Sequence, residues 1–461
     1  MSEIKNNYLN FLDLRKKYQT FTYESFSINK TNNNIEIEYN FNISGKFYFR
    51  PTIVIPKNNY FINEDKDLQN IVFNIGLIEL ISYWKAACCP EVIIKPAMLN
   101  QKQIEWWKKV YFNGLGEFFF LNGLIGKKEI NHIDFMNITC ESKNVFYPVN
   151  LKPDDSYIIP VGGGKDSVVT LELLKNTHKD NVCLIVNPRG ASTNCAKIAG
   201  FEKNRIININ RKIDDELLEL NNKGFLNGHT PFSALLGFVS VMVSIITGKK
   251  NIALSNESSA NESTVADSFV NHQYSKSFEF EFEFRNYIKE FICNDINYFS
   301  MLRPLSELQI GYLFSQNSKY FKAFKSCNAG SKKDLWCCKC SKCLFTFIML
   351  SLFMTEEEIT KIFGSNLLND KNLLIYFDQL IGNSKEKPFE CVGTTDEVNI
   401  ALTLTINKWK NKLPLLLEYY KSLPNYNIFK STDLQKFLNH FDSEHFLTIE
   451  QLNLINNAIH L

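Results

Sequence analysis

The sequence lacks several features that would assign it to a membrane or to a polymeric partner. Its 461 residues carry 51 Lys and Arg against 49 Asp and Glu, so no excess charge indicates a surface for nucleic acid or anionic lipid. The first residues, MSEIKNNYLNFLDLRKK, contain no continuous apolar run of the kind that a secretory signal requires. We therefore expect a cytoplasmic protein that binds neither nucleic acid nor a membrane.

Long apolar runs are also scarce. The longest, from Pro231 to Gly248, is interrupted by Ser and Thr and lies between predicted sheet elements, so a buried core helix is expected rather than a membrane span. Internal repeats and low-complexity linkers are absent from the sequence. The chain contains 12 Cys, which in a reducing compartment are expected to be free thiols and metal ligands rather than disulfides.

The composition, with 45% hydrophobic residues over 461 positions, permits two or three domains. Residues 1–150 alternate strand-like runs such as IEIEYNFNI with helical runs such as NIVFNIGLIELISYWKAA, which predicts an N-terminal α+β domain that could recognise a substrate. Its tryptophans, Trp84, Trp106 and Trp107, are expected to pack in the core.

From residue 151 to 325 the pattern changes to apolar strand, loop and helix in succession. This succession predicts a mostly parallel α/β sheet, whose ligands lie beyond the carboxyl ends of the strands. Residues 326–461 begin with a cluster of Cys and continue as helical patterns, which predicts a helical, Cys-rich C-terminal region.

Three glycines, Gly162, Gly163 and Gly164, follow the apolar strand SYIIPV and precede a predicted helix. Such a turn can direct several backbone N–H groups at an anion on the helix N-terminus. The Walker A pattern is absent, because Lys165 is followed by Asp166 rather than by Ser or Thr. The loop therefore favours phosphate binding without kinase-type transfer of the γ-phosphoryl group, and a non-binding glycine turn is the alternative.

The run GGGKDS resembles the PP-loop of the ATP pyrophosphatase superfamily, normally Ser-Gly-Gly-x-Asp-Ser, with Gly162 in place of the first Ser. The resemblance implies an adenine nucleotide alpha hydrolase-like fold and an ATP site at Gly162–Ser167, where Asp166 organises the loop or Mg²⁺. It also implies that the α-phosphorus is left open to a carboxylate while pyrophosphate departs. Val186 and Asn187, after the strand VCLIVN, occupy the position where the superfamily passes adenine and ribose.

Polar and titratable residues are concentrated after the predicted strand IALS, in SNESSANES at 255–263 and VNHQYSKS at 270–277. If this strand is parallel to the one before the glycines, both groups meet over one crevice; a solvated polar loop is the alternative. The candidate catalytic residues are Glu257, His272, Tyr274 and Lys276, together with Asp166. His272 or Lys276 is expected to be one proton-transfer base, although a structural hydrogen-bonding role for a lone His remains open.

Arg303, in the segment Arg-Pro-Leu, is a candidate clamp for pyrophosphate or for a substrate carboxylate, because a guanidinium can bind either bidentately. It could equally be a surface ion-pair partner.

The cysteines Cys327, Cys337, Cys340 and Cys343 form the pattern C-x9-C-x2-C-x2-C. A C-x2-C step brings two thiolates to one tetrahedral ion, so the pattern predicts a structural Zn²⁺ site. Buried free thiols, or paired thiols acting as proton-transfer bases as in metal-free glutamate racemases, are the alternatives. Cys338 could replace one ligand or remain spare. Cys391 could approach either this cluster or the active site.

Several blocks resemble the ATP-dependent UDP-N-acetylmuramoyl-L-alanyl-L-glutamate epimerases of the MurL type. They are SYWKAA at 82–87, WWKKVYFNGLGEFFFLNG at 106–123, PVGGGKDS at 160–167, SNESSANES at 255–263, VNHQYSKSFEFE at 270–281, the CCKCSKC cluster and FECVGTTDEV at 389–398. The resemblance implies that the terminal L-Glu of a UDP-muramoyl dipeptide is inverted to D-Glu for peptidoglycan synthesis and cell shape. It implies ATP and Mg²⁺ as cofactors, with AMP and pyrophosphate as products.

Two other functions remain open at this point. One is a different PP-loop enzyme that adenylates a carboxylate for an amidating or nitrile-forming reaction. The other is a non-catalytic nucleotide-binding protein, which the missing first Ser at Gly162 would favour and the presence of Asp166 and Ser167 would disfavour.

Overall fold

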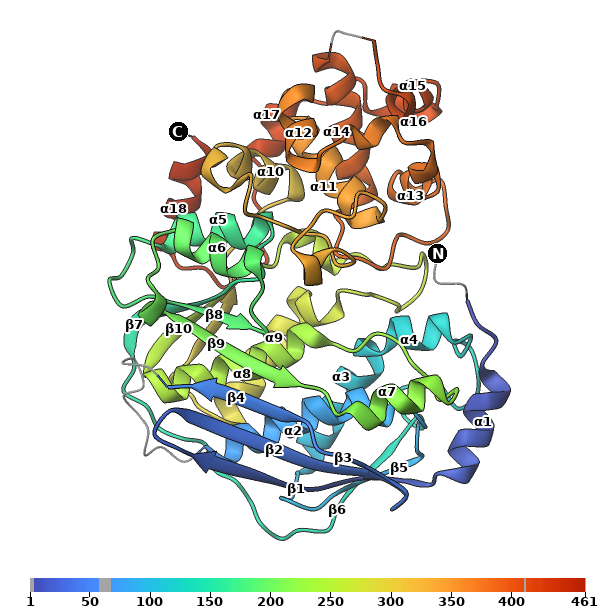
Figure 1. Ribbon diagram of the computed structural model, residues 1–461, viewed down its shortest axis with the longest axis vertical. Helices are drawn as coiled ribbons and strands as arrows, with labels where there is room; N and C mark the ends of the chain where they lie inside the picture. Colours follow the sequence, from blue (N-terminus) through green and yellow to red (C-terminus); the bar gives the residue numbers. More distant parts are fainter. Residues whose placement is uncertain (1–3, 58–67, 410–411, 461) are drawn as a thin grey trace.

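The structure is a computed structural model that describes residues 4–57, 68–409 and 412–460 (Figure 1). Within these residues the strands form one sheet of 11 strands in the order β11-β10-β7-β8-β9-β4-β2-β1-β5-β6, and β3 pairs with β2. The strands are β1 (Thr20–Lys30), β2 (Asn34–Ile43), β3 (Phe47–Phe49), β4 (Thr52–Pro56), β5 (Glu91–Ile94), β6 (Asn137–Cys140), β7 (Asp154–Pro160), β8 (Val182–Val186), β9 (Ile206–Lys212), β10 (Lys249–Leu254) and β11 (Asn297–Ser300).

Helices surround this sheet and form the C-terminal part of the molecule. The helices that precede β11 are α1 (Tyr8–Lys17), α2 (Gln69–Trp84), α3 (Gln101–Gly114), α4 (Gly116–Leu121), α5 (Lys165–Leu174), α6 (Gly190–Ile198), α7 (Asp215–Asn222), α8 (Phe232–Thr247) and α9 (Phe278–Phe291). Those after it are α10 (Glu307–Ser315), α11 (Ser341–Ser351), α12 (Glu356–Phe363), α13 (Leu374–Leu380), α14 (Thr395–Lys408), α15 (Leu415–Lys421), α16 (Pro424–Phe429), α17 (Leu434–Leu438) and α18 (Ile449–Ile459). The predicted α/β sheet and helical C-terminal region are confirmed.

The strands β11, β10, β7, β8 and β9 lie side by side in this order and are parallel to one another. The chain proceeds from β7 to β8 and β9 on one side, and then returns to place β10 on the other side of β7. In a parallel sheet such a reversal opens a crevice at the carboxyl ends of the two strands, because the connections leave in opposite directions. The switch therefore lies between the loop after β7 and the loop after β10.

The N-terminal strands extend the same sheet. Strand β4 pairs antiparallel with β9, with Ile53 opposite Arg211, and the order continues through β2 and β1. On one side of this joined sheet α2 packs against α8, so residues 1–150 share a hydrophobic core with the residues that follow.

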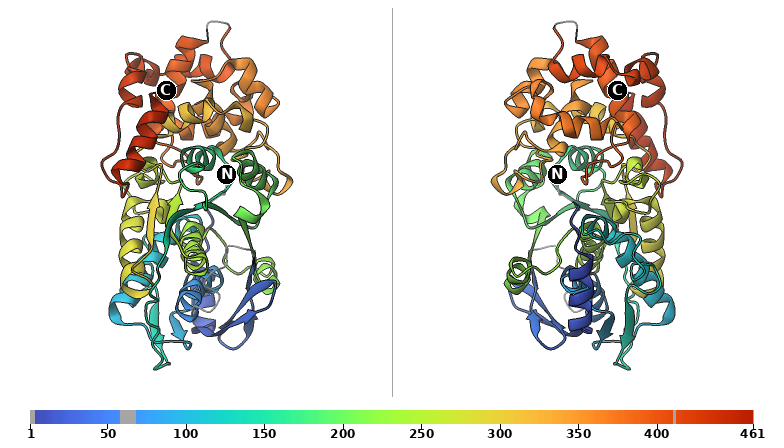
Figure 2. Two further views of the ribbon diagram at one scale, coloured as in Figure 1. Left: turned by 90° about the vertical axis from the view of Figure 1, so that its left-hand side faces the viewer. Right: turned by 90° about the vertical axis from the view of Figure 1, so that its right-hand side faces the viewer.

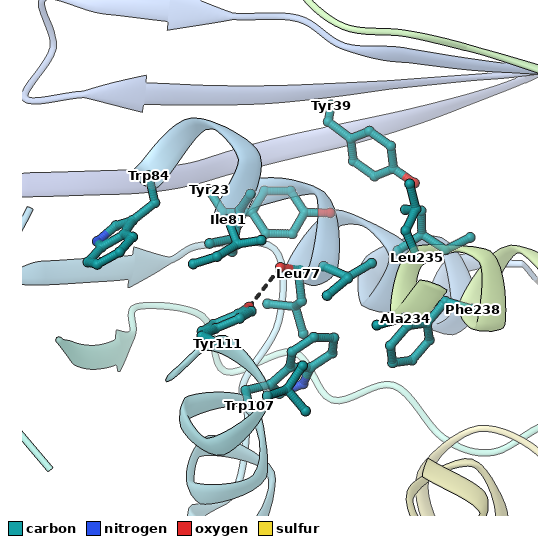
Figure 3. Close-up of a cluster of buried hydrophobic side chains, with 14 of the residues drawn as sticks. Tyr23, Tyr39, Leu77, Ile81, Trp84, Trp107, Tyr111, Ala234, Leu235 and Phe238 are labelled. Carbon is teal, nitrogen blue, oxygen red and sulfur yellow. Dashed lines mark hydrogen bonds between the residues drawn. The ribbon is translucent and has the colours of Figure 1, made fainter. Parts of the chain in front are cut away.

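This core is built from aromatic and aliphatic side chains (Figure 3). Trp84 and Trp107 are fully buried in it, and the hydroxyl of Tyr111 donates a hydrogen bond of 2.7 Å to the carbonyl of Leu77. Trp106 is partly buried and stacks on Tyr287 at 4.1 Å between ring centroids. The prediction that these tryptophans pack in the core is confirmed.

The predicted core helix within Pro231–Gly248 is α8. Its buried face packs between α2 and the sheet, and Gly248 ends it in the left-handed conformation with φ of 67°. In the part of the chain that is described, the helices fall short of the length and apolarity needed to cross a membrane.

The C-terminal helices lie at one end of the elongated molecule, opposite the N-terminal strands, in both views of Figure 2. Helix α10 packs on α5 and on α11, and α18 contacts α5. The backbone N–H of Lys325 donates to the carbonyl of Gly163 at 2.8 Å. The C-terminal region therefore meets the sheet at the glycine loop, residues Gly162–Ser167.

Candidate functional site

The glycine loop joins the end of β7 to the start of α5. Gly163 has a φ of +88°, and a Cβ there would lie 2.6 Å from the backbone nitrogen of Ser192, so neither the conformation nor the space admits a side chain. Gly164 is the N-cap of α5 and provides no side-chain acceptor. The first N–H groups of α5 are therefore available to an anion. Ser167 supports the turn, since its hydroxyl accepts from Gly163 N at 3.1 Å and donates to Gly164 O at 2.9 Å.

A cavity of about 220 Å³, which we call the loop cavity, lies at the carboxyl ends of β7, β8 and β10. Its lining includes polar groups of the glycine loop and of the loop after β10, and an apolar wall. These residues are Gly162, Gly164, Asp166, Ser167, Leu184, Val186, Leu236, Leu254, Ser255, Asn256 and Lys276. The structure thus brings the two predicted loops together over one crevice.

Asn187 is not part of this lining, although its neighbour Val186 is. The carboxamide oxygen of Asn187 accepts a 2.7 Å hydrogen bond from the backbone of Arg211, and its φ of 52° is left-handed. The side chain of Asn187 is therefore used in a hydrogen bond that connects the end of β8 to β9.

Lys165 is buried beneath the loop rather than exposed to the cavity. Its ammonium contacts the carboxylates of Asp166 and of Glu307, the first residue of α10. Burial raises the pKa of Glu307, while for Asp166 the opposing effect of burial is overcome by Lys165 and Lys342, which lower its pKa. Asp166 therefore remains an anion at the cavity, and Lys165 anchors the loop to the C-terminal region.

Lys276 connects the loop cavity to a cysteine from a distant part of the sequence. Its Nζ donates to Sγ of Cys391 at 3.0 Å. Burial opposes the charge of both groups, but Lys276 and His272 lower the pKa of Cys391 to about 5, and Cys391, Glu257 and Asp166 raise that of Lys276. At neutral pH the pair is a thiolate and an ammonium.

His272 continues this chain of titratable groups. Its Nδ1 lies 2.5 Å from Oε2 of Glu117 on α4. Burial disfavours the charged imidazole, but Cys391 and Glu117 outweigh burial and raise the pKa of His272 to about 10. The ring of His229 lies 4.4 Å from that of His272, and burial together with His272 lowers the pKa of His229 to about 3. One histidine is therefore charged and the other neutral.

We call the groups Cys391, His272, Glu117 and His229 the thiolate chain. Glu117 and His229 were missed in the sequence. The signal for Glu117 is a single carboxylate within the apolar run GLGEFFFL, but nothing local indicates His229, in GHT, because its partners are distant in sequence. The contact of His272 with Glu117 is a direct hydrogen bond between an imidazolium and a carboxylate, which is of the charge-assisted kind.

A second cavity, of about 660 Å³, adjoins the thiolate chain. Its lining includes Glu117 and Glu390, the residue before Cys391. Other lining residues are Phe120, Leu121, Cys340, Ser341, Tyr376, Gln379, Glu386, Lys387, Pro388 and Phe389. This volume is within the range of about 300–1,000 Å³ that is usual for ligand sites.

Arg303 is fully buried, so the interpretation as a surface ion-pair partner is wrong. It donates to the carbonyl of Glu257 at 2.7 Å, to the carbonyl of Lys276 at 2.6 Å and to the carboxylate of Glu281 at 2.8 Å. These contacts direct the guanidinium at protein acceptors. Arg303 thereby fixes the backbone of the two polar segments, residues 255–263 and 270–277.

The two remaining candidates lie near the site without lining the loop cavity. The carboxylate of Glu257 is buried and accepts from the hydroxyl of Ser259 at 3.3 Å. Tyr274 is buried against Phe280, with 5.9 Å between ring centroids, and burial raises its pKa.

The sulfur atoms of Cys327, Cys337, Cys340 and Cys343 lie within 4.8 Å of one another. Sγ of Cys343 is 3.7 Å from that of Cys337 and 3.5 Å from that of Cys340. Four sulfurs around zinc are about 3.8 Å apart, given Zn–S bonds of about 2.3 Å in a tetrahedron. The N–H of Gly330 also points at Sγ of Cys327, at 3.1 Å. The cluster could therefore hold zinc.

Neither neighbouring cysteine belongs to this set. Sγ of Cys338 lies 3.3 Å from the carbonyl of Phe363, and Cys391 contacts Lys276. The open question about Cys391 is thereby decided in favour of the loop-cavity side.

Comparison with known proteins shows the family of the chain. Residues 13–301 match the MurL N-terminal domain and residues 322–430 match the MurL C-terminal domain. A UDP-N-acetyl-alpha-D-muramoyl-L-alanyl-L-glutamate epimerase of Xanthomonas oryzae pv. oryzae is 33% identical over 346 residues, which are 73% of this chain and 75% of that protein. Proteins of the same name from Salinispora tropica and a Micromonospora species are 32% and 31% identical, over 84% and 86% of this chain and 85% and 89% of their own lengths. The chain therefore belongs to the MurL family.

Proposed function

We propose that this protein converts the terminal L-Glu of UDP-MurNAc-L-Ala-L-Glu to D-Glu, with cleavage of ATP to AMP and pyrophosphate, in the synthesis of peptidoglycan precursors. The observation that carries the proposal is the identity of 31–33% to relatives of this name, over 73–86% of the chain. The arrangement of the loop cavity and the thiolate chain supplies groups that suit each part of this reaction.

The glycine loop supports the ATP part of the proposal. The open N–H groups of α5 and the hydroxyl of Ser167 would hold phosphate oxygens, and the apolar wall at Leu184 and Val186 would accept the base. Asp166 is an anion at the same cavity and would hold Mg²⁺, which would neutralise phosphate charge there.

Activation is required because the Cα–H of a free carboxylate is a very poor acid. Its removal would place a second negative charge beside the first. Attack of the glutamyl carboxylate on the α-phosphorus forms an acyl-adenylate and releases pyrophosphate. The α-proton of this mixed anhydride is far more acidic, reprotonation from the other face inverts the carbon, and water then releases the D-epimer and AMP.

The remaining parts of the molecule have supporting roles in this proposal. A structural Zn²⁺ held by the four clustered cysteines would fix residues 327–343, which lead into α11. The ion would have a structural role, because four thiolates leave no open position for a substrate. Residues 1–150 and the second cavity would recognise the UDP-muramoyl portion. Free L-Ala-L-Glu should then be a much poorer substrate than the full nucleotide-linked dipeptide.

The test uses the full chain with Mg²⁺-ATP and UDP-MurNAc-L-Ala-L-Glu in deuterated water. We expect AMP, pyrophosphate and a D-Glu product that carries one deuteron at Cα. AMP that forms only when ammonia is supplied would instead indicate an amidating enzyme. ATP binding without turnover would indicate a nucleotide sensor, and either result would contradict the proposal.

A further inference from the structure

Three titratable groups form a connected set at the loop cavity: Lys276 lines it, Cys391 contacts Lys276, and His272 adjoins Cys391. Building on the proposed function, we propose that Cys391 is the catalytic base that takes the proton from Cα of the activated L-glutamyl residue. In this assignment Lys276 is a positioning residue that faces the activated carboxyl group and holds the sulfur beside it.

Geometry places the sulfur where this proton would be. Lys276 lines the loop cavity together with Asp166 and Ser167, and its Nζ touches Sγ of Cys391 at 3.0 Å. An acyl-adenylate formed over the glycine loop has its carbonyl carbon one oxygen away from the α-phosphorus, and Cα is the next atom. The Lys276 ammonium would therefore face the acyl-phosphate on one side and the sulfur on the other, which would bring Cα beside Cys391.

Charge distinguishes the three candidate groups. Lys276 and His272 both hold their protons at neutral pH, since the anions around them raise their pKa values, to about 10 for His272. Protonated groups cannot accept a proton. Cys391 is the anion between them, and its lone pair is available because Lys276, His272 and Lys342 offset the effect of burial.

The groups beyond Cys391 provide a route for the proton once it has been taken. His272 adjoins the thiolate and shares a 2.5 Å hydrogen bond with Glu117, whose carboxylate lies 3.7 Å from Nδ1 of His229. The exposed fraction of the side chain rises from 11% at His272 to 29% at His229. A nucleophile would not require such a path to solvent, whereas a base that must be reset does.

The step is balanced as a proton transfer. The Cα–H bond breaks, the proton forms an S–H bond on Cys391, and the electron pair of the broken bond becomes the enolate of the acyl-adenylate. A proton from water or from an acid on the opposite face then binds Cα and leaves it as D-Glu. To restore the base, His272 passes its Nδ1 proton to the carboxylate of Glu117 as it takes the proton of the Cys391 thiol, so the imidazolium and the thiolate are both re-formed.

The experiment compares Cys391→Ser with the wild-type chain and with Cys140→Ser, a partly buried thiol on β6, in deuterated water with Mg²⁺-ATP and UDP-MurNAc-L-Ala-L-Glu. Release of pyrophosphate reports adenylation, and deuterium at Cα reports proton transfer. We expect Cys391→Ser to retain pyrophosphate release while deuterium incorporation and D-Glu fall at least ~100-fold, the range of general base catalysis. Cys140→Ser should match the wild type in both.

Three results would overturn the assignment. They are D-Glu formation by Cys391→Ser within about threefold of wild type, equal loss of pyrophosphate release and deuterium incorporation, and a glutamyl thioester on Cys391 in acid-quenched wild-type protein. The last would make Cys391 a nucleophile. A wild-type chain that forms no D-Glu would instead contradict the proposed function, so the two failures are distinguishable.

A second measurement does not depend on the folding of a variant. The rate of alkylation of Cys391 by iodoacetamide, followed by peptide mass spectrometry of the wild-type chain from pH 4 to 9, reports the thiolate directly. We expect the rate to reach its plateau above about pH 6, as a thiolate with a pKa near 5 requires. A rate that rises only above about pH 8, the behaviour of an ordinary thiol, would overturn the assignment.

Discussion

Nζ of Lys276 and Sγ of Cys391 lie 3.0 Å apart, although 115 residues separate them in the sequence. Lys276 ends the short helix η3 (Tyr274–Lys276) after β10, whereas Cys391 lies in the segment before α14 in the C-terminal region. The contact therefore joins the two parts of the chain that match the two MurL domains. Because each group stabilises the charge of the other, the charge of the site depends on how these parts meet.

Replacement of Lys276 by Gln should raise the pKa of Cys391. The ammonium is the main group that lowers this pKa to about 5, and an adjacent opposite charge is worth roughly 1–3 pH units. The measurement is the pH midpoint of Cys391 alkylation. Lys387→Gln is the control, because Lys387 precedes Cys391 by four positions but binds the carboxylate of Glu262. An unchanged midpoint in Lys276→Gln would contradict the assigned ion pair.

The sequence predicted the parts of this site that are local and missed those that depend on tertiary contacts. The glycines, Asp166 and the polar loop after β10 were identifiable because a parallel sheet brings successive loops to one edge. The roles of Lys165 and Arg303 were not identifiable. Both side chains are oriented by buried carboxylates, Glu307 and Glu281, and no local pattern reveals which carboxylate a buried cation will meet.

Sequence patterns also could not predict that the N-terminal strands join the parallel strands in one sheet. Residues 1–150 show strands and helices of their own, so they predict a separate unit. The pairing of β4 with β9 connects positions about 160 residues apart, with Thr52 opposite Lys212, and alternation along either strand gives no information about its partner.

His272→Gln should reduce stability in a pH-dependent way. The folded-state pKa of His272, about 10, lies above its ordinary value of 6.5, so its stabilising contribution is complete below pH 6.5 and is lost as pH rises through 10. We expect the variant to lose ~1.5–3 kcal/mol of unfolding free energy near pH 6.5, the value of a hydrogen bond to a charged group, and less at pH 10. Urea unfolding at both pH values measures this difference.

His178 provides the control, because it is partly exposed and its Nδ1 lies 3.9 Å from the carboxylate of Asp180. His178→Gln should change the unfolding free energy little at either pH, because exposed pairs contribute roughly 0–1 kcal/mol. A loss in His272→Gln that is equal at pH 6.5 and pH 10 would show that the imidazole is not held in its charged form.

Asp166→Ala should abolish AMP formation. The carboxylate lines the loop cavity beside Ser167, and it contacts the ammonium of buried Lys165. Its loss removes a counter-charge of Lys165 and the proposed ligand for Mg²⁺, so we expect AMP formation to fall at least ~100-fold, as for other preorganised electrostatic groups. Asp155→Ala on β7, an exposed residue, is the control. A variant that produces AMP at the wild-type rate would remove the loop from the mechanism.

Purified protein should contain about one zinc ion per chain if the four clustered cysteines form the proposed site. Cys340→Ser should lower the zinc content and the melting temperature together, since binding of a structural ion contributes to folding. Cys338→Ser is the matched control, because this sulfur faces the carbonyl of Phe363. Elemental analysis and thermal unfolding measure both effects. A chain whose zinc content is unaffected by Cys340→Ser would exclude the site.

Arg303→Met should destabilise the protein by ~3–5 kcal/mol, the usual cost of removing one partner from a buried ion pair. The side chain of Arg303 is 0% exposed and that of its partner Glu281 is 2% exposed, so the substitution leaves a carboxylate without its counter-charge in a position that water does not reach. Lys102→Met, which breaks the exposed pair with Glu290, should cost roughly 0–1 kcal/mol because solvent compensates each charge. Denaturant unfolding compares the two. If both variants lost the same small free energy of unfolding, the buried ion pair of Arg303 would not stabilise the fold. Arg303 would then not hold the backbone at Lys276 in place.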